Sequence, residues 1–397
     1  MVTTGIYCQP GCAAKPLAEN VRTFELAASA EAAGFRACLR CRPYRIAGPI
    51  ASGAPELVCR AVQLIIDGVL DTGTEVTLAA RLAVSSRHLR RMFTGHLGVT
   101  PDQLARSRRA HFARRLLDDT DLTVTDVAFA SGFASLRQFN RQMREVFRAS
   151  PRELRARRHR ADRLTADGGL TMRLPFQPPF DWDAMVAFFA DRAVPGVESV
   201  AGQVYRRTIS LDGAPGALEV YPGGGDHLLL RAHLPYWEGL IHVAERVGRM
   251  VGAGIGPAIR APGAWGPVEV AAHAILAQNC DSHAEVRRHL GALAQNLGPR
   301  VPGLTHGLTH LFPSAEVLAN GELAMLGLPP TAVKSLTELT AGVARGDIVL
   351  HHGVPRAALL ASLTMVSGIE PATAHQIALR LGHREPVPGV DEVSPSA

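Results

Sequence analysis

The sequence has no uninterrupted apolar run of the ~18 residues that a membrane-spanning helix requires, and its first residues contain no apolar signal-peptide core. A membrane partner is therefore not expected, and a cytoplasmic location follows. Lysine occurs only twice in 397 residues, and aromatic residues make up only 5% of the chain. Six cysteines in a reducing compartment indicate metal binding or catalysis rather than disulfides.

Positive charge is concentrated in one segment. Residues 81–160 contain 18 arginines and 7 acidic residues, a net charge of +11, whereas the whole chain carries +6 and the remainder therefore carries −5. A merely solvated surface would mix basic and acidic residues more evenly. The excess predicts a phosphate-rich partner for this segment, and nucleic acid is the obvious one.

Four of the six cysteines form two short pairs, Cys8 with Cys12 and Cys38 with Cys41, which are separated by segment 13–37. Tetrahedral Zn²⁺ takes four such ligands, and a turn that carries two cysteines delivers two thiolates to one ion. The spacing therefore predicts one structural or catalytic zinc site. The other two, Cys59 and Cys280, have no partner in sequence and are expected to be buried free thiols.

The residues around these cysteines carry a family resemblance. Segments 3–12, 20–24 and 33–43 closely resemble the metal-binding domain of Ada-type adaptive-response proteins. The resemblance implies that Cys8 is both a zinc ligand and the nucleophile that takes a methyl group from a methylated DNA phosphotriester. Methylation would change the formal charge of the zinc–thiolate group from −2 to −1 and so favour DNA binding. The family domain begins with a further helical segment, so the chain is expected to be cut short at this end.

Residues 55–160 read as a series of amphipathic helices that contain two helix-turn-helix units, at 76–93 and 124–141. Ser85 and Ser135 are expected to cap the second helix of each unit, and Gly132 to form the turn in the second unit. Pro101 and Pro151 are each expected to start a new helix. Leu78, Ala79, Leu82, Leu89 and Phe93 have the helical spacing of a buried face.

The polar faces of the two second helices provide the candidate DNA contacts. They are Arg87, His88, Arg90 and Arg91 in the first unit and Arg137, Gln138, Asn140 and Arg141 in the second. These side chains can reach base edges or phosphates in the major groove, and the sequence does not distinguish the two. The pair of units resembles the AraC-type double helix-turn-helix over nearly the whole segment. The alternative, an ordinary helical bundle, would not explain the arginine excess.

After a Gly168–Gly169 linker, the second half of the chain changes character. Strands are expected at 171–176, 203–210, 216–222 and 226–233, with helices at 183–191 and 237–251. Segments 171–180 and 196–208 resemble the N-terminal domain of AlkA-type 3-methyladenine DNA glycosylases.

The last third of the chain is expected to be helical. Segments 269–278 and 363–378 resemble the first helix and the helix-hairpin-helix of the glycosylase catalytic domain. The resemblance implies that Gly368 lies in the turn that holds a DNA phosphate. The family's catalytic aspartate falls on Asp391 if one residue is deleted and on Glu392 otherwise.

Several features depart from the glycosylase pattern. Glu370 replaces the second hairpin glycine, Ala372 replaces an aromatic residue, and the chain ends shortly after Asp391, so the closing helices are expected to be missing. No Pro-Cys-His-Arg sequence occurs, which excludes the alkylguanine-transfer domain. The histidines at 306, 310, 351 and 352 lack metal-ligand spacing and are expected to be scattered over the surface.

The sequence therefore predicts a multidomain α+β protein. Its parts are a small zinc domain (1–46), an all-α double helix-turn-helix domain (55–160), an α+β AlkA N-terminal-like domain (170–252) and an all-α helix-hairpin-helix domain (260–397). The family resemblance, to Ada–AlkA fusion proteins, implies an alkylation-damage regulator that binds promoter and alkylated double-stranded DNA, with RNA polymerase as a further partner. Two hypotheses remain open: an active repair glycosylase, or a regulator whose glycosylase half has decayed.

Overall fold

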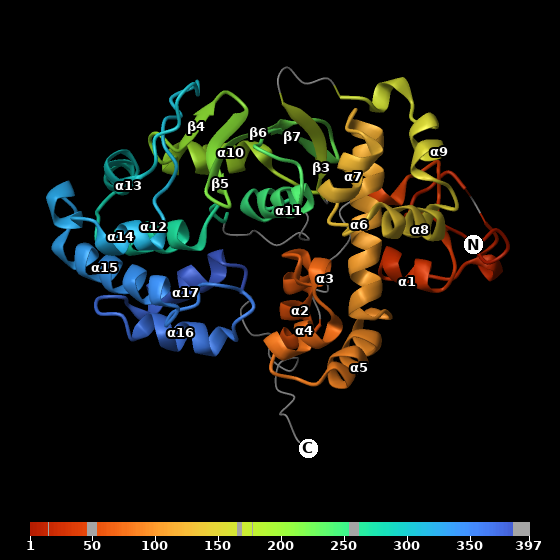
Figure 1. The fold of residues 1–397 in the computed structure, drawn as a ribbon, viewed down its shortest axis with the longest axis horizontal. Coiled ribbons are helices and arrows are strands. Elements are labelled where there is room, and N and C mark those ends of the chain that lie inside the picture. The colour runs from red at the N-terminus through yellow and green to blue at the C-terminus, as the bar shows by residue number, and fades with distance from the viewer. Residues whose placement is uncertain (15, 46–53, 165–168, 177, 254–261, 384–397) are drawn as a thin grey trace.

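The fold is known from a computed structural model (Figure 1). The structure describes residues 1–14, 16–45, 54–164, 169–176, 178–253 and 262–383. No helix in these ranges is long and apolar enough to cross a membrane. The arrangement is multidomain and α-rich with one β-sheet domain, so the predicted fold class is confirmed.

The N-terminal module is small and is built around two very short parallel strands. Strand β1 (Ile6–Tyr7) pairs with β2 (Arg36–Ala37), and helix α1 (Ala27–Ala32) lies between them in the chain. The 3₁₀ turns η1 (Ala18–Asn20) and η2 (Pro43–Arg45) complete the described part of the module.

Eight helices follow, in the order expected of two helix-turn-helix units. They are α2 (Glu56–Ile66), α3 (Val69–Thr72), α4 (Glu75–Arg81), α5 (Ser86–Leu97), α6 (Pro101–Asp119), α7 (Val124–Ala130), α8 (Leu136–Phe147) and α9 (Pro151–Ala156). The side chains of Ser85 and Ser135 accept hydrogen bonds from backbone N–H groups of α5 and α8, as predicted. Gly132 adopts φ +79° in the turn before α8, which confirms its expected role.

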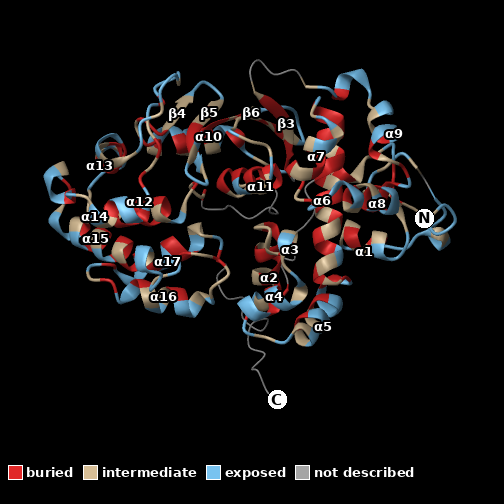
Figure 2. Ribbon diagram, viewed as in Figure 1, coloured by how far each residue is buried: buried red, intermediate tan, exposed pale blue. Residues whose placement is uncertain are grey.

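Helix α6 is the central element of the fold. Its 19 residues extend over about 28 Å, and it contacts α1, α2, α7, α8, α9 and β3. Buried residues occur along most of its length because other elements cover it on several sides (Figure 2). The second helix-turn-helix unit, the N-terminal module and the sheet share one continuous apolar core across this helix, whereas the first unit has its own core.

The sheet has five antiparallel strands in the order β3-β7-β6-β5-β4. They are β3 (Leu170–Pro175), β4 (Glu198–Ala201), β5 (Val204–Leu211), β6 (Ala214–Pro222) and β7 (His227–His233). Burial alternates along β7, and its buried residues share a core with α10 (Trp182–Arg192) and α11 (Leu240–Met250). The four predicted strands and both helices are confirmed; strand β4 was not predicted.

The C-terminal helices enclose a separate apolar core. They are α12 (Pro267–Gln278), α13 (His283–Leu297), α14 (Ala315–Asn320), the 3₁₀ turn η4 (Leu323–Leu326), α15 (Pro330–Arg345), α16 (Arg356–Thr364) and α17 (Pro371–Arg380). Helices α16 and α17 form the predicted helix-hairpin-helix.

A buried arginine joins the sheet to the C-terminal helices. Arg207 on β5 is 1% exposed, and its guanidinium donates hydrogen bonds to both carboxylate oxygens of Glu269 on α12, at 3.0 and 2.9 Å. It also donates to Glu198 Oε1 on β4 at 3.1 Å. Because the two carboxylates are themselves mostly buried, each depends on this cation for charge compensation.

We expect Arg207→Ala to lower the free energy of unfolding by about 3–5 kcal/mol, since it leaves the buried Glu269 carboxyl without its charge and hydrogen-bond partner. Denaturant unfolding followed by tryptophan fluorescence measures the effect. Arg345→Ala is the control because its ion pair with Asp347 is exposed on both sides, and it should cost less than about 1 kcal/mol. Equal effects of the two substitutions would contradict this account of the interface.

Candidate metal centre and nucleic-acid interface

The four predicted cysteine ligands come together at one end of the N-terminal strand pair. Cys8 directly follows β1 and Cys38 directly follows β2, so the parallel register places them side by side. Gly11, at φ +81°, turns the chain so that Cys12 returns to the same point. The four Sγ atoms all lie within 4.8 Å of one another.

The electrostatics of the cluster favour a bound cation. Burial and a hydrogen bond with Cys38 raise the pKa of the Cys8 thiol, and burial raises the pKa of Cys41 to about 11. The pKa of Cys38 is lowered, because backbone N–H groups of Cys41 and Arg40 outweigh the opposing effect of burial. Closely spaced thiolates repel one another, so this cluster needs a dication to be fully deprotonated.

The geometry fits a tetrahedral metal site. Zn–S bonds of about 2.3 Å place the four sulfurs roughly 3.8 Å apart, which is compatible with the observed limit of 4.8 Å. Cys38 is buried and the other three cysteines are half-buried, so Cys8, Cys12 and Cys41 are each partly exposed to solvent. The structure thus brings together all four cysteines that the sequence singled out.

Two polar contacts bind this module to helix α6. The Tyr7 hydroxyl, next to Cys8 in the chain, donates to Glu31 Oε1 at 2.7 Å and lies 3.1 Å from His111 Nε2 on α6. His111 also pairs with Glu31 at 2.6 Å, and this imidazole holds the pKa of Glu31 low despite its burial. These residues were not predicted from the sequence, because Glu31 and His111 belong to different domains and lie far apart in the chain.

The second contact follows the last cysteine. Tyr44 and Arg45, in η2, donate hydrogen bonds to the buried carboxylate of Asp118 near the end of α6, at 3.1 and 3.0 Å. Arg42 pairs with Asp162 at 2.7 Å. The metal cluster is therefore held between two anchors on the helix that connects the two helix-turn-helix units.

Helix α5 presents its predicted basic side chains to solvent. Arg87, Arg90 and Arg91 are exposed and His88 is half-buried. The Arg90 guanidinium is paired with Glu75 at 2.7 Å, and Arg91 lies 3.2 Å from His88 Nδ1. These arginines line a surface hollow of about 450 Å³ between α4 and α5.

Helix α8 offers a similar face at the second unit. Arg137 and Arg141 are exposed, and Gln138 and Asn140 are half-buried. Arg141 approaches Glu145 only to 3.9 Å, and within the described residues no acidic side chain pairs with Arg137. Asn140 donates back to the Leu136 carbonyl at 2.8 Å. Arg137 is thus the cation on this face that is most available to a phosphate.

In the hairpin between α16 and α17, several backbone groups that could bind a phosphate are already hydrogen-bonded to side chains of this chain. The carbonyl of Gly368 (φ +80°) accepts a hydrogen bond from Gln278 Nε2 at 2.9 Å, and the N–H of Glu370 donates to Gln278 Oε1 at 3.2 Å. The N–H of Ser367 donates to the Glu338 carboxylate at 3.1 Å. The side chain of Glu370 is exposed, as is Ala372. Asp391 and Glu392 lie outside the described residues.

Two expectations about individual residues need correction. His351 and His352 are not scattered surface histidines: both imidazoles converge on the Asp67 carboxylate at the end of α2, and His352 is buried. Cys59 and Cys280 are half-buried rather than buried. The adjacent histidines were a visible signal, but their partner lies in the other half of the chain.

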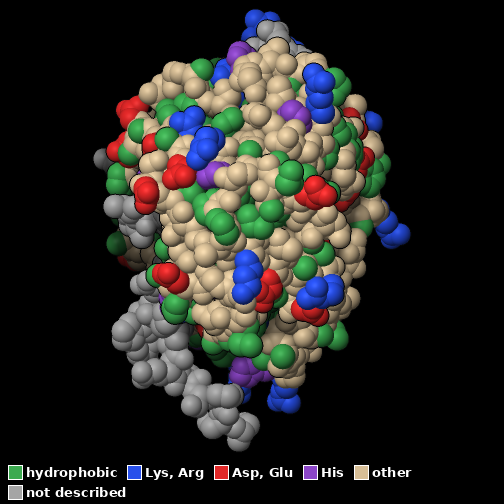
Figure 3. All heavy atoms as spheres, turned by 90° about the vertical axis from the view of Figure 1, so that its left-hand side faces the viewer, with side chains coloured by type: hydrophobic (Ala, Val, Ile, Leu, Met, Phe, Trp, Pro, Cys, Tyr) green, Lys and Arg blue, Asp and Glu red, His purple; other side chains and the backbone are tan. Residues whose placement is uncertain are grey.

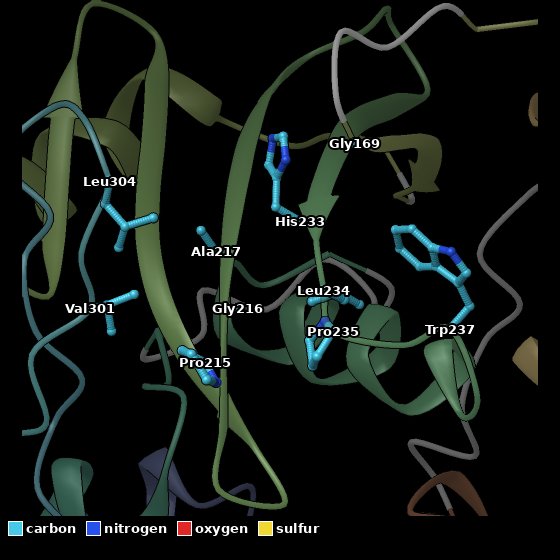
Figure 4. Close-up of a pocket in the computed structure, with 10 residues that line it drawn as sticks. All are labelled: Gly169, Pro215, Gly216, Ala217, His233, Leu234, Pro235, Trp237, Val301 and Leu304. Atoms are coloured by element: carbon cyan, nitrogen blue, oxygen red, sulfur yellow. The ribbon is translucent and has the colours of Figure 1, made fainter.

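A cavity of about 320 Å³ lies where β6 and β7 meet the loop containing Val301 and Leu304 (Figure 4). Its lining is mainly proline, glycine and aliphatic side chains, with His233 and Trp237 at the edge and no acidic residue. On the face over α13–α15, basic and acidic side chains are interspersed (Figure 3), in contrast to the arginine-rich helices α5 and α8.

Three segments of the chain match known protein families. Residues 1–44 match the metal binding domain of Ada, residues 78–157 match a helix-turn-helix domain, and residues 171–265 match the AlkA N-terminal domain.

Among curated proteins, the probable bifunctional transcriptional activator/DNA repair enzyme AlkA of Mycobacterium tuberculosis is 35% identical over 98% of this chain and 84% of its own length. The Escherichia coli bifunctional transcriptional activator/DNA repair enzyme Ada is 32% identical over 38% of this chain and 42% of its own. DNA-3-methyladenine glycosylase 2 of Escherichia coli is 28% identical over 52% of this chain and 79% of its own length. Among solved structures, the 3-methyladenine DNA-glycosylase from Archaeoglobus fulgidus gives a TM-score of 0.44 at 19% identity, over 53% of this chain and 79% of that one.

We expect Arg137→Ala to weaken DNA binding and to reduce the slope of log K against log salt by about 1, since one phosphate contact is lost. Fluorescence anisotropy over a salt series measures both quantities. Arg345→Ala removes another exposed arginine, on α15 far from α5 and α8 (Figure 1), and should change neither quantity. If Arg137→Ala and Arg90→Ala both leave binding unchanged at every salt concentration, α5 and α8 do not form the DNA interface.

Proposed function

The chain belongs to the family of bifunctional transcriptional activators and DNA repair enzymes that combine Ada-type and AlkA-type domains, and we propose that it senses DNA alkylation through Cys8. In this function it binds promoter DNA through α5 and α8, and recruits RNA polymerase as an activator. The observation that carries the proposal is the position of the four-cysteine cluster, which is anchored on both sides to the helix that joins the two DNA-reading units.

The metal in this function is zinc, held by Cys8, Cys12, Cys38 and Cys41. Four thiol ligands within 4.8 Å of one another suit Zn²⁺ better than harder cations. When bound, zinc keeps the thiols deprotonated at neutral pH. The half-buried position of Cys8, at the end of β1, leaves its sulfur open to a DNA backbone.

The proposed reaction is a single displacement. The Cys8 thiolate attacks the methyl carbon of a methylphosphotriester, a new S–C bond forms, and the C–O bond breaks. The electron pair of that bond stays on the phosphate oxygen, so the product is an ordinary phosphodiester anion and an S-methyl thioether. The thioether has no proton to lose and no route back to the thiol, so each chain reacts once.

The methylated protein is expected to bind DNA more tightly. Converting one thiolate to a neutral thioether removes one negative charge from a module that packs against α6 and α8. Less repulsion of DNA phosphates then adds to the attraction of the arginines on the two recognition helices.

For the C-terminal half we propose weak or absent excision of 3-methyladenine, which is the regulator-only alternative. The N–H groups of Ser367 and Glu370, which would face a DNA phosphate, are already donated to Glu338 and Gln278. The exposed carboxylate of Glu370 would repel a phosphate, and Ala372 offers no ring on which a base could stack.

Incubation with methylphosphotriester DNA should add one methyl group per chain, on the peptide that contains Cys8, as measured by mass spectrometry. The methylated chain should then show a lower Kd for promoter DNA than the unmodified chain. Cys59→Ser is the control, because this thiol lies outside the cluster and its loss should leave transfer intact. Methylation of a different cysteine would refute the assignment of Cys8.

We expect single-turnover release of 3-methyladenine from alkylated duplex DNA to be weak or undetectable, since missing base stacking alone costs ~1–3 kcal/mol. The assay compares the unsubstituted chain with Asp391→Asn and Glu392→Gln. Robust release that disappears in Asp391→Asn would restore the glycosylase hypothesis. Release that survives Asp391→Asn but disappears in Glu392→Gln would do the same and would make Glu392 the catalytic residue.

A further inference from the structure

A second cluster of metal-ligand side chains lies in the C-terminal half, at the connection between α12 and α13. Cys280, Glu285 and His289 each offer a ligand atom, and these three atoms all lie within 4.8 Å of one another. They are a thiol, a carboxylate and an imidazole, a set that suits borderline divalent ions such as Zn²⁺. None of the three takes part in the function proposed above.

The local structure fixes two of these ligands on one face of α13. Ser282 caps the helix by accepting from the N–H of Glu285, and Glu285 and His289 are then one helical turn apart. The N–H of Asp281 donates to Glu285 Oε2 at 3.3 Å, which orients the carboxylate. Cys280, in the turn just before the helix, completes the cluster.

The contacts of His289 leave its Nε2 as a hydrogen-bond acceptor, the role that a metal ligand requires. Its side chain is 3% exposed, and Arg288 donates a hydrogen bond toward Nε2 at 3.3 Å. Glu285 Oε1 lies 3.6 Å from Nε2, which is too far for a hydrogen bond. Because Arg288 can only donate, Nε2 must present its lone pair to the cluster.

The Arg288 guanidinium already contacts two of these ligand atoms. The same Arg288 nitrogen is 3.2 Å from Glu285 Oε1 and 3.3 Å from His289 Nε2, so a guanidinium bridges two of the three ligand atoms. The Arg288 side chain is 67% exposed and is free to swing into solvent. The cluster is therefore arranged for positive charge, and its present cation can be displaced.

A third cluster, formed by Asp67, His351 and His352, is less suited to a metal ion because the ring nitrogen of His351 that faces the carboxylate carries the proton. There the N–H of Gly353 donates to His351 Nδ1 at 2.9 Å, so the proton of the neutral imidazole is on Nε2, the atom that faces Asp67. His351 therefore contacts the carboxylate as a hydrogen-bond donor. Arg249, which pairs with Asp67 at 3.0 Å, is only 25% exposed, so it is less easily displaced than Arg288. The cluster on α13 is therefore the better candidate for a metal site.

We propose that Cys280, Glu285 and His289 form a second metal site, for a borderline divalent ion such as Zn²⁺, which displaces Arg288 on binding. With three protein ligands it is weaker than the four-cysteine site and keeps one position for water.

Metal at this site would stiffen the turn that supports the hairpin. Gln278 and Asn279 immediately precede Cys280, and Gln278 bonds to both Gly368 and Glu370 in the hairpin. Asn279 meets the Thr331 hydroxyl on α15. The site therefore lies where three helices of the C-terminal core are held together.

Zinc titration of the full chain against a chromophoric chelator tests the proposal. The unsubstituted protein should bind one tight and one weaker zinc, and Cys280→Ser should weaken the second at least roughly 100-fold while leaving the first unchanged. Cys38→Ser should do the reverse, which separates this proposal from the function of the four-cysteine site. Cys59→Ser is the matched control and should retain both.

Arg288→Ala gives a prediction of opposite sign. Removing the competing cation should tighten the second zinc, and circular dichroism should show an unchanged fold. With Co²⁺ as the probe, a chain in which Cys8, Cys12, Cys38 and Cys41 are all replaced by Ser should retain a thiolate-to-cobalt charge-transfer band, and adding Cys280→Ser should abolish it. A second zinc that is absent, that persists in Cys280→Ser, or that weakens in Arg288→Ala would overturn the proposal.

Discussion

The fold depends on two buried carboxylates at the end of α6. Asp118 accepts hydrogen bonds from Tyr44 and Arg45 of the metal-binding module, and Asp119 binds Arg173 of strand β3. Both aspartate side chains are almost completely buried, so each would be strongly destabilising without its partners. The metal module, the double helix-turn-helix and the sheet are therefore joined at one point, and the apolar core is continuous across it.

This joint determines how a chemical change at Cys8 can reach the DNA-reading surface. Tyr7 adjoins Cys8 and bonds to Glu31 and, across the interface, lies against His111 in the middle of α6. Helix α6 in turn leads from α5 to the second unit over about 28 Å. Under the proposed function, a chemical change at Cys8 would reach the recognition helices through this helix.

Much of the fold could be predicted because its determinants are local. Ser85 and Ser135 cap the helices that directly follow them, Gly132 turns the chain at a positive φ, and the cysteine pairs lie on short turns. Strand β4 was missed because its four residues are at most half-buried and carry little periodic signal.

The contacts between modules could not be predicted in the same way. Three ion pairs join different domains: His111 with Glu31, Arg207 with Glu269, and His352 with Asp67. Nothing in the sequence near either partner shows the other, because these pairs are made by the folded chain. The hairpin is an intermediate case. Gly368 and Glu370 were placed in it from the sequence, but the hydrogen bonds that both make with the Gln278 side chain were not predicted.

The central claim is that the metal module and the DNA-reading helices form one body through α6. Hydrogen–deuterium exchange of the full chain, with and without removal of its metal by a chelator, tests it most directly. The account predicts that metal removal increases exchange in the last turns of α6 and in β3 (Leu170–Pro175), as well as around the cysteines. Increased exchange confined to residues 1–45, with α6 unchanged, would contradict it.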